Sequence, residues 1–106
     1  MQIEFLYSDD CPSHERALQL LHQVLSDEGA EADIAIHQVE TDEQAQAVRF
    51  PGSPTIRING ADIDAQRDNP IGLACRTYIR GDGRVSPLPG RELIVDAVRR
   101  ALAKAS

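Results

Sequence analysis

The sequence predicts a single α/β domain over residues 1–106, with a small mixed β-sheet and helices on both faces. Three observations lead to this prediction. The chain has 106 residues, which gives room for one hydrophobic core. Runs with the two-residue period of strands alternate with runs that have the 3.6-residue period of helices. An Asn-Gly pair between two short runs is typical of a tight hairpin, so at least one strand pair is expected to be antiparallel.

The N-terminal part has the pattern of a strand followed by a helix. Residues 3–7 are apolar and aromatic and end in a polar turn, as strands often do. Residues 12–28 place apolar side chains at three- and four-residue steps, which is typical of an amphipathic helix. Pro12 suits the first helical position, which puts Cys11 at the N-cap. Gly29 is expected to end the helix, because glycine readily adopts a positive φ.

A second strand and a short helix are expected next. Residues 33–39 alternate, with the two isoleucines on one face. The lengths of strand, helix and strand fit a right-handed crossover, which predicts that the two strands are parallel. Thr41 and Gln44 have the spacing of a capping box, which favours a helix over residues 42–49.

The second half is expected to contain short strands and a final helix. A loop rich in proline and glycine at residues 50–54 precedes it, and Asn59-Gly60 supplies the hairpin turn. The expected elements are a strand at 55–58, a strand from Ala61, an alternating run at 75–80 and a helix over 91–104.

Charge and composition exclude several classes of partner. Lys and Arg total 11 against 17 Asp and Glu, so the formal net charge is −6. Nucleic acids and anionic membranes need clustered positive charge, and neither is expected as a partner. The sequence shows no membrane span and no signal peptide, which favours a cytoplasmic location. The oligomeric state is not predicted.

Cys11 is the first candidate for chemistry. It stands between the expected strand and helix, where free backbone N–H groups and the helix dipole favour the thiolate, the reactive form of cysteine. His14 lies one turn further along and can pair with that thiolate when protonated. Asp9 and Asp10 oppose this effect, because nearby negative charge raises the pKa of a thiol. We expect the dipole and His14 to prevail, with Ser13 as a further tuning residue.

The second candidate motif is Gly52-Ser53-Pro54-Thr55, directly before an expected strand. A strand that ends in Cys-Pro at a helix start, then Ser-Pro-Thr before a strand, then Asn-Gly, resembles the thioredoxin fold. The resemblance covers nearly the whole chain. It implies a three-layer sandwich in which Pro54 is cis and faces Cys11. The residues implied to shape a substrate groove are Pro12, Ser53, Pro54 and Thr55.

A narrower resemblance rests on the segments FLYSDDCPSH, FPGSPTIRINGADID and GLACRTY, and on Pro-Gly-x-x-x-Ile at the final helix. This set is similar to small bacterial thioredoxin-like proteins that are often described as alkylmercury lyase-like. Some of those relatives carry selenocysteine at the position of Cys11. Thioredoxins resolve a mixed disulfide with a second cysteine in Cys-x-x-Cys, but His14 occupies that fourth position here.

Two routes to resolution remain open. Glutathione or another small thiol can release a substrate from Cys11, or Cys75 can do so if the fold brings the two cysteines together. Cys75 is equally compatible with a plain core position on an alternating strand. The leading expectation is a thiol-dependent redox protein that acts on a small thiol or a protein disulfide.

Two other functions are alternatives to thiol redox chemistry. Cys11 and Cys75, with a nearby carboxylate such as Asp10, have the ligand set of a soft-metal or organomercurial site. The chain is also compatible with a non-catalytic interaction domain that keeps the fold. The remaining candidates are expected to be structural or solvated: His22, His37, the strand arginines Arg57 and Arg76, and the Arg80-Gly81-Asp82 turn.

Overall fold

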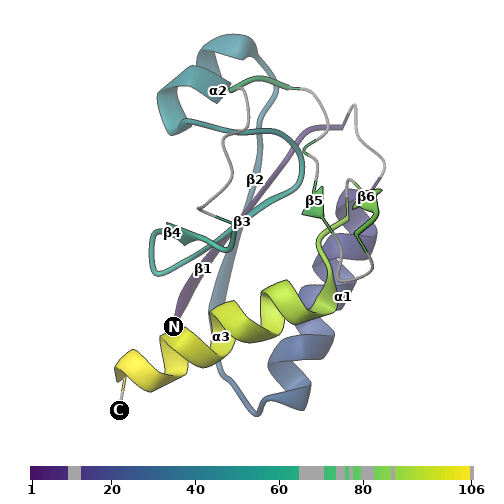
Figure 1. The fold of residues 1–106 in the computed structure, drawn as a ribbon. Helices are drawn as coiled ribbons and strands as arrows, with labels where there is room; N and C mark the ends of the chain where they lie inside the picture. The colour runs from purple at the N-terminus through teal and green to yellow at the C-terminus, as the bar shows by residue number, and fades with distance from the viewer. Residues whose placement is uncertain are drawn as a thin grey trace.

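The structure is a computed structural model, and it describes residues 1–9, 13–64, 71–73, 76, 78–79, 83–86 and 88–105. These residues form an α/β fold with a four-stranded mixed sheet, three helices and a separate pair of short strands (Figure 1). Within this part of the chain, no helix is both long and apolar enough to cross a membrane.

The main sheet has the strand order β2-β1-β3-β4. Its strands are β1 (Gln2–Tyr7), β2 (Asp33–Gln38), β3 (Thr55–Ile58) and β4 (Ala61–Asp62). The central strand β1 is parallel to β2, which confirms the predicted parallel pair, and antiparallel to β3. Ile3 pairs with Ile34 on one side and with Ile58 on the other, so apolar residues of three strands share one face.

Helices pack on both faces of this sheet. They are α1 (His14–Asp27), α2 (Asp42–Val48) and α3 (Arg91–Ala105). The larger core lies between the sheet and the helices α1 and α3, which are on the same side in Figure 1; its members include Phe5, Leu21, Ile56 and Val98. On the opposite face a smaller cluster joins β1 to α2 through Leu6, Val39, Ala45 and Phe50. Because neighbouring residues of a strand point to opposite faces, Phe5 and Leu6 belong to different clusters.

Helix α1 begins later than the sequence suggests. The prediction that Cys11 is the N-cap is wrong: the cap residue is Ser13, whose carbonyl accepts the first helical hydrogen bond from Ala17 N at 3.1 Å. Proline at a first helical position is a preference and does not fix where hydrogen bonding begins. The other end follows the prediction. Gly29 has φ +62°, and Ala30 N donates to Leu25 O at 2.9 Å, so the helix closes in a Schellman motif.

Local hydrogen bonds confirm the predicted start of α2. Thr41 Oγ1 accepts from Gln44 N at 3.1 Å, as a capping box requires. The side chain of Gln44 reaches back to accept from Glu40 N at 2.8 Å. Arg49 follows the helix in the left-handed conformation, with φ +53°, and ends it.

The Asn59-Gly60 hairpin also forms as predicted. Both residues have positive φ, +51° and +85°, which matches a turn that joins twisted antiparallel strands. Asn59 also contacts the beginning of β1: its amide donates to Gln2 O at 2.7 Å, and its side-chain oxygen accepts from Gln2 N at 2.9 Å. The turn therefore anchors the first residues of the chain.

Two features differ from simple expectations. The alternating run at 75–80 contributes the short strand β5 (Tyr78–Ile79), which pairs with β6 (Val85–Ser86), a strand the sequence pattern does not reveal. In β2, Ile36 is 52% exposed although it pairs with the fully buried Phe5. This exposure arises because β2 is the edge strand of the sheet.

Candidate functional site at the cis-proline segment

The structure describes part of the predicted site. Cys11, Cys75, Pro12 and Asp10 lie outside the described residues. Ser13 and His14 are described at the beginning of α1. Ser53, Pro54 and Thr55 are described where the loop after α2 enters β3, and we call these three residues the cis-proline segment.

The Ser53–Pro54 peptide bond is cis, as the resemblance to the thioredoxin fold implies. All three side chains of the segment are buried. Their polar atoms form hydrogen bonds with other groups of the protein, and these hydrogen bonds determine the conformation of the loop. The segment is therefore part of the protein interior.

Ser53 connects two distant parts of the chain. Its Oγ accepts a hydrogen bond from the amide of Ser8 at 2.9 Å, at the point where β1 has ended. Its carbonyl accepts a hydrogen bond from the amide of Arg76, also at 2.9 Å. Ser8, Ser53 and Arg76 are all buried. Ser8 lies three residues before Cys11 in the sequence and Arg76 directly follows Cys75, so Ser53 is hydrogen-bonded to one described residue near each cysteine.

His14 has a contact that the sequence did not predict. Its imidazole stacks on the ring of Tyr7, with centroids 4.4 Å apart and planes 19° apart. Tyr7 is the last residue of β1 and His14 is the first of α1, so the stack bridges the two ends of the strand-to-helix connection. A loop length cannot reveal such a contact, because it depends on how the helix turns back against the strand.

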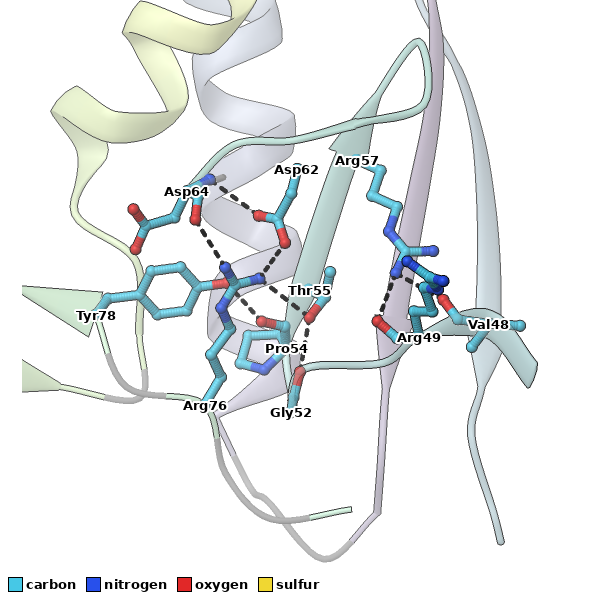
Figure 2. A network of polar contacts seen from close by, with 10 residues as sticks. All are labelled: Val48, Arg49, Gly52, Pro54, Thr55, Arg57, Asp62, Asp64, Arg76 and Tyr78. Carbon is cyan, nitrogen blue, oxygen red and sulfur yellow. Dashed lines mark hydrogen bonds and ion pairs between the residues drawn. The ribbon is translucent and has the colours of Figure 1, made fainter. Parts of the chain in front are cut away.

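Arg76 is the centre of a buried polar network, shown in Figure 2. Its side chain is expected from the sequence to be solvated at a strand edge, and this expectation is wrong, since Arg76 is 2% exposed. Its Nη1 donates to Asp62 Oδ2 at 2.7 Å and to Thr55 Oγ1 at 3.3 Å. Its Nη2 donates to the carbonyl of Asp64 at 3.1 Å. The guanidinium thus joins the end of the β3–β4 hairpin to the cis-proline segment.

Tyr78 completes the enclosure of that segment. Its hydroxyl donates to Pro54 O at 2.6 Å, and its ring faces the guanidinium carbon of Arg76 at 4.9 Å from the ring centroid. A guanidinium over an aromatic face is attracted by the negative charge density of the ring. Thr55 Oγ1 in turn donates to Gly52 O at 2.7 Å. Each of these contacts is internal to the protein, and together they leave the backbone of the loop few ways to move.

One donor of this network has no acceptor. Among the described residues, Arg76 Nε is buried without a hydrogen-bond partner. A buried unpaired donor typically costs about 1–3 kcal/mol, and more when the group is charged. The arginine is therefore held by its ion pair and stacking despite an unfavourable contribution from Nε.

Burial raises the pKa of the Tyr78 hydroxyl above its ordinary value, although the positive charge of Arg76 opposes the shift. We predict that Tyr78 ionises only well above the ordinary tyrosine pKa of about 10. The measurement is the phenolate absorbance that the wild type gains with rising pH and that Tyr78→Phe does not gain. The folded state then holds a proton that the unfolded chain has released. The stabilisation that Tyr78 contributes is complete below the pKa of tyrosine in the unfolded chain and is lost as the pH rises from that value towards the higher pKa of the folded state. Urea unfolding of wild type and Tyr78→Phe across pH 8 to 11 checks the sign, and parallel curves for the two proteins would contradict it.

Arg57, the other strand arginine, is also not a simple solvated residue. It is half-buried, and its Nη2 donates to the carbonyls of Val48 and Arg49 at 2.8 and 3.0 Å (Figure 2). Arg57 therefore donates hydrogen bonds to carbonyls at the C-terminal end of α2, where a helix offers them no amide of its own. His22 and His37 are exposed, in agreement with the expectation that they are solvated if they are not structural. No group of three or more metal-ligating side chains is found in the part of the chain that the structure describes.

No protein-family model, curated protein or solved structure matches this chain.

Proposed function

We propose that the protein is a thioredoxin-like thiol redox protein in which Cys11 is the nucleophile and Cys75 is the second thiol. The observation that supports this proposal is the pair of hydrogen bonds at Ser53. One reaches the chain just before Cys11 and the other reaches the residue bonded to Cys75. Two residues that lie near the two cysteines in the sequence, Ser8 and Arg76, are thus hydrogen-bonded to the same buried residue.

Chain geometry makes this attachment informative. One residue of extended chain spans at most about 3.6 Å, so the chain limits Cys75 to one residue from the anchored Arg76 and Cys11 to three residues, roughly 11 Å, from the anchored Ser8. A disulfide needs Cα atoms within roughly 7 Å. A shared anchor at Ser53 limits how far apart the two thiols can lie, which supports an exchange within one chain.

The reaction follows from two thiol exchanges. The Cys11 thiolate attacks one sulfur of a substrate disulfide, and the other sulfur leaves as a thiolate and takes up a proton. Cys75, after losing its proton, attacks Cys11 Sγ in the mixed disulfide and releases the second substrate thiol. The substrate gains two electrons and two protons, and the protein becomes a Cys11–Cys75 disulfide. Two molecules of glutathione or another small thiol return it to the dithiol and become a disulfide.

The test is intact mass after mild oxidation with glutathione disulfide, followed by alkylation in denaturant. We expect the wild-type monomer to take up no alkyl group, and to take up two after reduction. Cys11→Ser and Cys75→Ser serve as controls and keep one alkylatable or glutathione-modified thiol each. Glutathione on Cys11 with Cys75 still alkylatable would show that an external thiol resolves the enzyme. Two unmodified thiols in the oxidised sample would contradict the proposal.

A soft-metal or organomercurial site on Cys11, Cys75 and Asp10 is the alternative that the residue types leave open. No contact among the described residues favours it over redox chemistry. It predicts that one Hg(II) or Zn(II) ion binds per chain and that Cys11→Ser and Cys75→Ser lose this ion equally. The redox proposal instead predicts that reduction of a disulfide substrate depends on Cys11 more strongly than on Cys75.

A further inference from the structure

We propose that Arg76 is a positioning residue that holds the cis-proline segment against the chain bearing Cys75 and thereby sets the balance between dithiol and disulfide. The inference rests on the proposed function. It concerns a buried arginine whose partners lie on three different parts of the chain: the cis-proline segment, the β3–β4 hairpin and strand β5.

Both ends of Arg76 contact the same segment. Its backbone amide donates to Ser53 O at 2.9 Å, and its guanidinium donates to Thr55 Oγ1 at 3.3 Å. Tyr78 holds the residue between them through Pro54 O at 2.6 Å. Three consecutive residues are thus held by Arg76 and Tyr78, so the position of the segment is coupled to the position of the chain that directly follows Cys75.

The side chain needs an arginine for this role. The planar guanidinium donates at once to Asp62, Thr55 and the Asp64 carbonyl, and it also faces the Tyr78 ring. A lysine carries a compact charge with three donors and lacks a planar face to stack, so it cannot reproduce this set of contacts. The unpartnered Nε is consistent with a guanidinium fixed by its surroundings, because the side chain does not turn to satisfy that atom.

Arg76 can influence the redox balance through geometry. The exchange is protein dithiol plus glutathione disulfide, giving protein disulfide plus two molecules of glutathione. Its equilibrium constant measures how effectively the folded chain presents one thiol to the other. A role confined to stability would weaken the dithiol and disulfide forms equally and would leave this constant unchanged. A positioning role changes the constant itself.

The experiment compares Arg76→Lys with Arg57→Lys. Arg57 is a matched control, because it also donates twice to other groups of the fold but contacts α2 and not the cis-proline segment. The equilibrium constant is measured in glutathione buffers by alkylation and mass, with folding of each sample verified by circular dichroism. Thr55→Val, which removes the hydroxyl that Arg76 contacts, is measured in parallel in case Arg76→Lys does not fold.

We expect Arg76→Lys to lower the equilibrium constant by about tenfold or more, and Thr55→Val to lower it by a smaller factor. Arg57→Lys is expected to stay within about twofold of the wild type. If the wild type forms the disulfide and the folded Arg76 and Thr55 variants keep its equilibrium constant, the positioning role is overturned and the proposed function stands. If the wild type forms no Cys11–Cys75 disulfide, both the role of Cys75 as the second thiol and the positioning role of Arg76 are overturned.

Discussion

Replacement of Arg76 by methionine is expected to lower the free energy of unfolding by about 3 kcal/mol. Removal of one member of a buried ion pair typically costs about 3–5 kcal/mol, because the remaining charge loses its partner. Asp62 is partly exposed, which places the expected value at the lower end. Thr55 and the Asp64 carbonyl also lose a donor. Urea unfolding followed by circular dichroism measures this change.

Arg91 supplies the matched control. It also pairs with an aspartate, Asp27, but its side chain is 44% exposed. Exposed ion pairs are typically worth about 1 kcal/mol or less, so Arg91→Met is expected to have a small effect. Equal losses in the two methionine variants would show that burial of the Arg76 pair contributes nothing.

The second large effect is expected at Phe50, which is fully buried in the small cluster beneath α2. Phe50→Ala removes an aromatic ring from a packed site and is expected to cost about 3–5 kcal/mol. Phe50 also positions the loop before the cis-proline segment: its amide donates to Ala45 O at 2.8 Å and its carbonyl accepts from Gly72 N at 3.0 Å. The neighbouring Val48 is 41% exposed, so Val48→Ala is expected to cost less than about 1 kcal/mol.

Thermal unfolding of the two alanine variants checks this prediction. A loss at Phe50 no larger than at Val48 would mean that the small cluster does not support the fold. A normal stability loss at Phe50 together with an unchanged glutathione equilibrium would instead show that the loop keeps its position without the ring.

The elements that sequence reasoning located well are those whose signals are local. Asn59 and Gly60 are good turn formers whatever surrounds them, and the turn forms as predicted. Thr41 accepts a hydrogen bond from the Gln44 amide, and the Gln44 side chain accepts one from the Glu40 amide, all within one helical turn. In both cases the stabilising interactions lie within a few residues of each other, so the local sequence is enough to predict the element.

Arg76 shows why part of the candidate site was missed. Its alternating neighbours indicated a strand, and arginine on a strand is usually solvated. Its partners Thr55, Asp62 and Asp64 belong to another hairpin, and nothing near residue 76 points to them. The one signal in the sequence was the pair of carboxylates, Asp62 and Asp64, at the end of the predicted hairpin, because a carboxylate can form an ion pair with a buried cation.

Other differences arise from the order of strands in the sheet. Ile34 and Ile36 have the same pattern, but β2 is an edge strand, and only Ile34 packs against the larger core while Ile36 stays exposed. Strand β6 consists of only Val85 and Ser86, which is too short to give a periodic signal. A one-dimensional pattern identifies strands, but their neighbours decide which faces are covered.

The central position of β1 has a consequence for synthesis of the chain. Ribosomes deliver β1, α1 and β2 first, and the parallel pair can form as soon as Gln38 has emerged. The other edge of β1 has no strand to pair with until Thr55–Ile58 have been made. During that interval the nascent chain presents an open edge with Ile3 and Phe5 beside it, which is the kind of surface that attracts wrong partners. The Asn59–Gln2 hydrogen bonds that fasten the first strand are among the last contacts of the sheet to become available.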